Sequence, residues 1–327
     1  HSTRVDISPG GHKKKSLEKN DGQGHRKNPV TARPYEPQLV LRADSRRVLA
    51  EFWADGPDSE TPPGHWNVVA NAASDQLRTH RVANSGPELD RLEWDVKLYL
   101  ALNGATHDAA IAAWELKRVF DSIRPISALR YLAQLGQSSD PALPSYHPAG
   151  LPLEPGLVEL ITGESGRDLG RHSNLSFDVG KIAFRAYQGP PRKPDEEVAG
   201  VGWLLGENWL PFQRGDFVTP PFAGFISGHS TFSRAAAEVL AALTGSPFFP
   251  GGIARVPIRA NDFLEAERGP AEDLELQWAT YYDAADDAGL SRLYGGIHIE
   301  ADDLNGRVIG AAIGKQAWQR ARELFGP

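Results

Sequence analysis

The feature that most constrains the fold is the proline-free stretch from Glu88 to Phe120. Apolar residues recur along it at intervals of three to four positions, the period of an α-helix. They are Leu89, Leu92, Val96, Leu100, Ala110, Ile111 and Trp114. The stretch therefore predicts one long helix, or two helices that meet near Gly104.

Further helical patterns lie on both sides of this segment. Residues from Ser45 to Trp53 and from Trp66 to His80 have helical spacing. A third helix is expected from about Ser230 to Thr244, because an apolar stripe there ends at a glycine. A fourth is expected from Asp303 to Leu324. The predicted fold class is all-α, a helical bundle.

The remaining segments are irregular in pattern. Residues 138–225 are rich in Gly and Pro, and only short helices are expected there, near Leu157–Thr162 and Ser176–Tyr187. Such stretches commonly wrap a core or line a functional face. Alternating strand patterns are scarce. We expect an extended N-terminal arm over 1–45 and one helical domain with long wrapping loops over 46–327.

Composition excludes several function classes. The 327 residues carry a net charge of −7, which argues against a surface that coats nucleic acid. No apolar run approaches the roughly 20 residues of a membrane helix. The chain has no cysteine, so disulfides, thiolate catalysis and iron–sulfur clusters are excluded. It starts with His1 instead of Met, so we expect further sequence upstream, where a signal peptide would direct it to the periplasm or out of the cell.

The first chemistry-bearing segment runs from Lys117 to Pro125. Lys117 and Arg124 are seven positions apart, which is two helical turns, so a continuous helix would project both cations from one face. Proline at 125 is expected to end that helix. Taken alone, this pattern also fits a solvated basic face.

The second segment contains Ser227, Gly228 and His229 directly before an apolar helix. The N-terminus of a helix offers unpaired backbone N–H groups and a positive dipole, which suit a phosphate-like oxyanion. Glycine allows the backbone to approach such an anion closely. Taken alone, the serine is equally well explained as a helix cap beside an unrelated histidine.

The third segment runs from Ser291 to Asp302 and contains Arg292, Gly295-Gly296 and His298. Arg292 offers a planar fork of donors for an oxyanion. The two glycines permit a tight bend before His298, and Asp302 four positions later is placed to hold the imidazole in one tautomer. Taken alone, the segment also fits a surface loop.

In order, the three segments read Lys-x6-Arg-Pro, Ser-Gly-His and Ser-Arg-x5-His-x3-Asp. This pattern resembles the active-site pattern shared by vanadium-dependent haloperoxidases and type 2 phosphatidic acid phosphatases. The arm around Asn20–His25 and the segment Trp53–Trp66 look like those of bacterial vanadium haloperoxidase-like proteins. The resemblance covers most of the chain and implies the helical bundle of that superfamily.

The resemblance also implies roles for individual residues. Lys117, Arg124 and Arg292 would neutralise the oxygens of vanadate, with hydrogen bonds from Ser227 Oγ and the Gly228 N–H. His298 would bind vanadium directly. His229 would act as the acid–base group when hydrogen peroxide adds, and Asp302 would support His298.

The resemblance leaves two enzymatic branches open. A haloperoxidase would oxidise bromide, and chloride in some members, with hydrogen peroxide to hypohalous acid for an organic acceptor. A soluble acid phosphatase would instead form a phosphohistidine at His298, because phosphate and vanadate are close mimics. Trp114 and Phe222 match positions where fungal chloroperoxidases carry a Trp and a Phe, which favours the haloperoxidase, although both rings also fit core packing.

A third possibility is a non-catalytic helical protein that only binds an oxyanion. The implied partners are small molecules, with neither nucleic acid nor a membrane span, and the sequence leaves the oligomeric state open. Fungal chloroperoxidases are longer and build two helical bundles, so substrate access and halide preference do not follow from the resemblance.

Overall fold

The structure is a computed structural model that describes residues 3–11, 24–57 and 59–326. The residues from Asn20 to Gln23, part of the arm that carries the family resemblance, lie outside the described residues. The chain divides into two compact units. The first comprises residues 1–122, 222–264 and 269–327, and the second comprises 123–221 and 265–268. The sequence predicted a different division, into an arm over 1–45 and one domain over 46–327. That division of the chain into domains stays a prediction.

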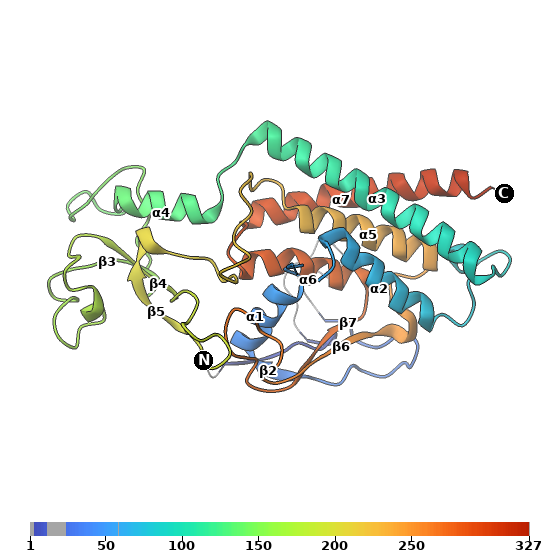
Figure 1. Cartoon of the computed structure of the whole chain (residues 1–327), viewed down its shortest axis with the longest axis horizontal. Coiled ribbons are helices and arrows are strands. Elements are labelled where there is room, and N and C mark those ends of the chain that lie inside the picture. The colour runs from blue at the N-terminus through green and yellow to red at the C-terminus, as the bar shows by residue number, and fades with distance from the viewer. Residues whose placement is uncertain (1–2, 12–23, 58, 327) are drawn as a thin grey trace. The chain divides into compact units, whose positions relative to one another are not determined.

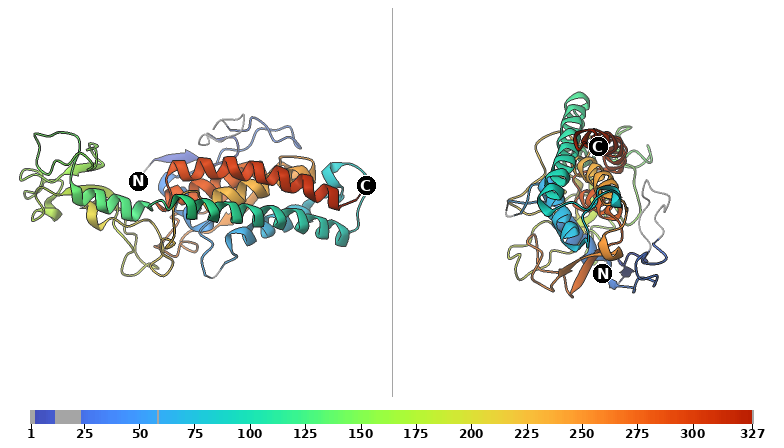
Figure 2. Two further views of the ribbon diagram at one scale, coloured as in Figure 1. Left: turned by 90° about the horizontal axis from the view of Figure 1, so that it is seen from above. Right: turned by 90° about the vertical axis from the view of Figure 1, so that its right-hand side faces the viewer.

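The first unit is a helical bundle, with the long helices lying side by side in two views (Figures 1 and 2). Its helices are α1 (Arg42–Phe52), α2 (Pro62–Gln76), α3 (Arg91–Phe120), α5 (Gly228–Thr244), α6 (Tyr281–Tyr294) and α7 (Glu300–Leu324). Its 3-10 turns are Val82–Asn84 and Pro250–Gly252. The prediction of a mainly helical bundle is confirmed.

Two small antiparallel ribbons complete the first unit. Strand β1 (Arg4–Asp6) pairs with β2 (Leu39–Leu41), in the register Val5 opposite Val40. Strand β6 (Ala254–Ile258) pairs with β7 (Leu274–Trp278). The N-terminal segment therefore contributes to the core, since Val40 is buried there.

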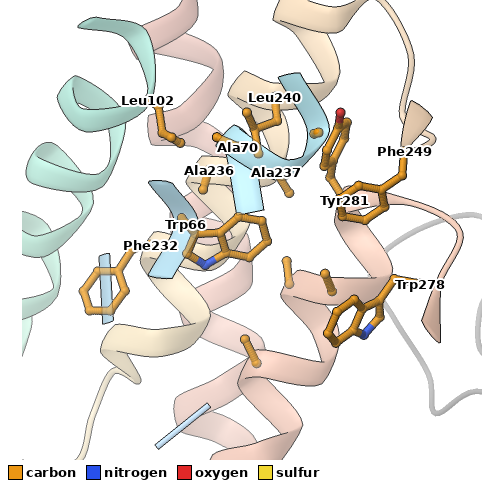
Figure 3. Close-up of a cluster of buried hydrophobic side chains, with 14 of the residues drawn as sticks. Trp66, Ala70, Leu102, Phe232, Ala236, Ala237, Leu240, Phe249, Trp278 and Tyr281 are labelled. Carbon is orange, nitrogen blue, oxygen red and sulfur yellow. The ribbon is translucent and has the colours of Figure 1, made fainter. Parts of the chain in front are cut away.

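Helix α5 is the centre of the bundle. Thirteen of its residues are buried, and α3, α6 and α7 all pack against it. Three consecutive small residues, Ala235, Ala236 and Ala237, precede larger ones such as Leu240 along α5. Trp66 of α2 lies against the same cluster (Figure 3). The indole N–H of Trp66 donates to Ser233 Oγ at 2.8 Å, which pins α2 to α5.

Three glycines on α7, Gly306, Gly310 and Gly314, face α5. A Cβ atom added at Gly310 would lie 2.3 Å from the backbone oxygen of Thr231, and one at Gly314 would lie 2.6 Å from that of Ala235. No side chain fits at these distances. The two helices therefore meet backbone to backbone.

Helix α3 is one continuous helix without a break at Gly104. Most of the large apolar residues that reveal its period are exposed: Leu92, Val96, Leu100, Ile111 and Trp114. The buried stripe consists mainly of small residues such as Ala101, Ala105, Ala109 and Ala113. Small side chains let α3 approach α5 closely. The spacing of the large apolar residues therefore predicted the helix correctly but did not show which face of it is buried.

The second unit contains α4 (Pro125–Leu135), a 3-10 turn at Ser173–Leu175 and another at Gly206–Asn208. It also contains a three-stranded antiparallel sheet, β3 (Val158–Leu160), β4 (Ile182–Tyr187) and β5 (Val201–Leu205), with β4 in the middle. The short helices expected near Leu157–Thr162 and Ser176–Tyr187 are therefore wrong. Ile182, Phe184 and Tyr187 are residue types that favour strands. The buried side chains of the sheet, Leu160, Ile182 and Phe184, form one apolar cluster with Ala133 of α4.

Among the described residues, no helix is long and apolar enough to cross a lipid bilayer.

Candidate functional site

The C-terminal end of α3 supplies a buried cation. Lys117 is 4% exposed, and its Nζ donates hydrogen bonds to the backbone oxygens of Ala223 and Gly224, each at 2.8 Å. The Oγ of Ser122 accepts a hydrogen bond from the Phe225 N–H at 2.6 Å. The first sequence motif thus holds the loop that leads into the second.

Two aromatic rings lie beside this cation. The rings of Trp114 and Phe222 are 5.4 Å apart, and Lys117 Nζ lies 5.9 Å and 5.5 Å from their centres. Both rings are about half exposed. They therefore form a partly solvent-facing apolar edge next to the charge and are not core residues.

Arg124 does not continue the helix of Lys117. Helix α3 ends at Phe120 because Asp121 takes a left-handed conformation, and Pro125 starts α4 instead of ending α3. Proline is favoured at the first position of a helix, where its missing N–H is not needed. The expectation that both cations project from one continuous helix is therefore wrong. Arg124 is buried and belongs to the second unit, so its part in the site stays a prediction.

The second motif forms the start of α5. Ser227 is fully buried and caps the helix, with its Oγ accepting from the Ser230 N–H at 3.3 Å. A Cβ atom added at Gly228 would lie 2.9 Å from the Phe232 ring and 3.3 Å from the Trp114 ring. Glycine is thus required where α3 approaches the first turn of α5.

The third motif places Arg292 in the last turn of α6. The side chain is 4% exposed, and its guanidinium donates to Ser291 Oγ at 3.0 Å and to the backbone oxygen of Ala50 at 2.7 Å. The chain then turns through Gly296, whose φ is +77°. A left-handed turn of this kind favours glycine, as the double glycine indicated.

His298 and Asp302 form a local pair at the start of α7. His298 Nδ1 lies 2.8 Å from Asp302 Oδ2, and the same oxygen accepts from the Ile299 N–H at 3.3 Å. Both side chains are buried. A carboxyl oxygen held by the first turn of a helix therefore fixes the orientation of the ring through Nδ1.

The three motifs contact one another. The Ser227 N–H donates to the Asp302 backbone oxygen at 3.0 Å, which joins the second motif to the third. Lys117 joins the first motif to the second through its two carbonyl contacts. Burial lowers the pKa of His229, and Arg292 of the third motif is close enough for its charge to lower that pKa further. Segments far apart in the sequence therefore converge on the N-terminus of α5.

His229 has a partner that the motif analysis missed. Its Nε2 lies 3.2 Å from Oδ2 of Asp55, a residue in the loop between α1 and α2. The other carboxylate oxygen, Oδ1, lies 2.8 Å from His65 Nδ1. The only sequence signal was the likeness of the Trp53–Trp66 segment to haloperoxidase-like proteins, and this pointed to no individual residue.

Burial and charge set the protonation of this pair. Burial of the ring lowers the pKa of His229, and the nearby charge of Arg292 lowers it further, against the hydrogen bond to Asp55. For Asp55, burial alone would raise the pKa, but the hydrogen bonds from the two imidazoles outweigh it and hold the pKa at about 2. At neutral pH the site therefore pairs a neutral His229 with an ionised Asp55.

Comparison with known proteins identifies the family of the chain. The profile of the family described as the VCPO second helical-bundle domain matches residues 97–327, well over half of the chain. No curated protein matches the sequence closely enough to count as a relative.

Solved structures share the fold. The chain is similar to a holo-type and an apo-type bacterial vanadium-dependent chloroperoxidase, with TM-scores of 0.56 and 0.57 and 18% sequence identity to each. Each comparison covers 87% of this chain but only 45% and 46% of the other, so the chain spans about half the length of these proteins. A bacterial vanadium-dependent iodoperoxidase is 20% identical, with a TM-score of 0.46 over 85% of this chain and 44% of that one. The matched helical bundle, with its three converging motifs, places this chain in the family of the VCPO second helical-bundle domain, within the vanadium haloperoxidase-like superfamily.

Proposed function

We propose that the protein is a vanadate-dependent haloperoxidase that oxidises bromide or chloride with hydrogen peroxide to hypohalous acid. The observation that carries the proposal is the pair of histidines on contacting segments, each held by a carboxyl group, together with the buried cations Lys117 and Arg292 of the same three motifs. The matched solved structures named as vanadium-dependent chloroperoxidases support the choice of cofactor and substrate.

The donor set fits a tetrahedral oxyanion such as vanadate. Lys117 and Arg292 supply positive charge, and Arg124 would add a third cation. The start of α5 adds the Ser227 hydroxyl and the Gly228 N–H, where the close approach of Trp114 and Phe232 leaves no room for a side chain. Burying such an anion without cations would be prohibitively unfavourable, which explains the residue types.

Each residue would then have a distinct task. His298, with Nδ1 turned to Asp302, would offer Nε2 to vanadium. Bound vanadate supplies the Lewis-acid chemistry that activates hydrogen peroxide toward a halide. His229 is neutral at pH 7, so it can accept the proton that peroxide loses on binding and return it when the product oxygen leaves.

The apolar edge of Trp114 and Phe222 favours a halide over a phosphoester as the second substrate. Aromatic rings next to Lys117 place apolar surface beside the positive charge, which suits a weakly hydrated anion. Neither ring can donate a hydrogen bond to the polar oxygens of a phosphoester through its face.

A paired assay on metal-free protein tests the proposal. Bromide oxidation is measured with vanadate and hydrogen peroxide, and hydrolysis of a phosphomonoester is measured without vanadate. We expect vanadate to activate the first reaction by orders of magnitude over the apoprotein. Hydrolysis inhibited by vanadate, without halide oxidation, would assign the acid phosphatase with a phosphohistidine at His298. The absence of both reactions would leave a non-catalytic oxyanion-binding protein.

A further inference from the structure

The carboxylate of Asp55 is shared by two imidazoles. Its Oδ1 meets His65 Nδ1 at 2.8 Å and its Oδ2 meets His229 Nε2 at 3.2 Å. The Asp55 side chain is 1% exposed, and those of His65 and His229 are 11% and 16% exposed. Three polar side chains are thus enclosed together in the first unit, and His65 belongs to none of the three sequence motifs.

We propose that His65 is a positioning residue for His229: through the shared Asp55 carboxylate it fixes the orientation of the His229 ring and keeps the proton of the neutral ring on Nε2. This inference rests on the proposed function, in which His229 transfers protons. It adds a residue of α2 to a site whose other residues in the first unit come from α3, α5, α6, the start of α7 and the loop between α1 and α2.

The backbone conformation of Asp55 indicates that the position of this carboxylate is fixed by the fold. Its φ is +53°, in the left-handed region that most side chains avoid but that Asp and Asn tolerate. With two oxygens and two N–H donors, the carboxylate can satisfy both rings at once. If one donor is lost, the carboxylate is free to rotate and the geometry at the other ring is lost with it.

His65 is itself held by aromatic packing. Its ring stacks on Trp53 with centres 4.4 Å apart and planes inclined by 26°, and it meets the Phe52 ring edge-on at 4.9 Å. Rings packed on two sides leave little freedom of rotation. The packing therefore fixes the orientation of the His65 ring, with Nδ1 toward Asp55.

The groups that face His229 define its proton affinity. Asp55 and the backbone of Trp53 face it from the segment after α1, Arg292 faces it from α6, and the Phe232 ring lies 6.0 Å away on α5. Asp55 and the Trp53 backbone favour the protonated ring, whereas Arg292 opposes it. A donor from His65 holds the Asp55 carboxylate in the orientation that favours the protonated His229 ring, so its removal should weaken the hold of Asp55 on the His229 proton.

The test is the nitrogen chemical shifts of the histidines in the vanadate-free full chain, labelled with ¹⁵N-histidine and followed from pH 5 to 9. The signal of His229 is assigned with the variant His229→Gln. We expect the neutral ring of the parent protein to carry its proton on Nε2. A proton found on Nδ1 would overturn the proposal without any further variant.

The decisive variant is His65→Phe, which keeps a ring between Phe52 and Trp53 but removes the donor. We expect the pKa of His229 to fall by about half a unit to one unit, because the misplaced carboxylate stabilises the protonated ring less, and a population protonated on Nδ1 to appear. His65→Asn, whose amide lies near the position of Nδ1, should restore most of the parent behaviour. If His65→Phe does not fold, His65→Gln replaces it, since its amide reaches past that position.

The matched control is His25→Phe, because His25 Nε2 also lies 2.9 Å from a carboxylate, that of Asp283, and its ring also packs edge-on against a phenylalanine. This variant should leave the His229 signals unchanged. A His229 titration that is the same in His65→Phe and in the parent would show that His65 only packs. These measurements need no vanadate and no turnover, so they stand even if the paired assay detects no halide oxidation.

Discussion

The two histidines of the site are held by carboxyl groups in opposite ways. His298 meets Asp302 four positions along the chain, through Nδ1. His229 meets Asp55, 174 positions away, through Nε2. The carboxyl group therefore contacts Nδ1 of the ring in the first pair and Nε2 of the ring in the second.

The difference follows from how each pair is built. Asp302 lies in the first turn of α7, so the start of one helix is enough to bring it to His298. Asp55 reaches His229 only after α2 has packed on α5 through contacts such as the Trp66–Ser233 hydrogen bond. The local pair depends on one helix, whereas the distant pair depends on the whole bundle.

The largest contrast is expected when each ring is removed. His298→Ala should abolish vanadate binding and halide oxidation, because it deletes the only proposed protein ligand of vanadium. His229→Ala should still bind vanadate, more weakly, and lose about 10²- to 10⁴-fold in kcat, the range typical of a lost acid–base group. Vanadate affinity by ⁵¹V resonance and initial rates by halogenation of a dye provide the two measurements. Equal losses of affinity in both variants would contradict the division of roles.

Removing the carboxyl groups should give a smaller contrast. Asp302→Asn should weaken vanadate binding by about 10- to 100-fold, since it disturbs the group that orients the vanadium ligand. Asp55→Asn retains the side-chain shape and tolerates the left-handed backbone, so it should change vanadate affinity little. It should instead shift the pH dependence of turnover. Titration calorimetry of both variants with vanadate distinguishes these outcomes, and a greater loss of affinity in Asp55→Asn would reverse the assignment.

The distant pair should also leave a signature in acid stability. The pKa of Asp55 is about 2 in the folded protein, below the ordinary value of 3.8. Its stabilisation is thus fully present above pH 4 and is lost as the pH falls toward 2. The ionised Asp55 contributes about 2 kcal/mol to the free energy of unfolding. Urea unfolding of the parent and of Asp55→Asn at pH 5 and at pH 2.5 should show their difference shrinking toward the acid side. A difference that stays constant would place the stabilisation elsewhere.

The smallest effect is expected outside both pairs. Phe222→His would replace the apolar ring that faces Lys117 with a ring that can donate a hydrogen bond. This should lower chloride turnover more than bromide turnover, by about threefold, as one peripheral contact is rarely worth more. Rates with both halides are compared across pH at equal vanadate loading, with Phe120→His as the control because Phe120 is also exposed near the end of α3. An unchanged chloride-to-bromide ratio would mean that Phe222 only packs.

Local signals were sufficient for the long helices and for the His298–Asp302 pair. The period of α3, the glycine that ends α5 and the spacing of the third motif each depend on a few neighbouring residues. The sequence did not predict the strands of the second unit, because short strands with an irregular burial pattern such as β4 lack clear alternation. It also missed Asp55, since no local pattern distinguishes an acidic loop residue that meets its partner only in the folded bundle.

The glycines of α7 have a consequence for how such a site tolerates change. Because Gly310 brings the α7 backbone against the Thr231 carbonyl, the separation of α5 and α7 is set by main-chain atoms that have no rotamers. Substitutions elsewhere in the core can be absorbed by side chains without altering the registration of Ser227 against Asp302. The spacing between the second and third motifs is therefore much more sensitive to substitution at Gly310 than to substitution elsewhere in the core. A single methyl group at Gly310 would push α5 and α7 apart and separate the two motifs.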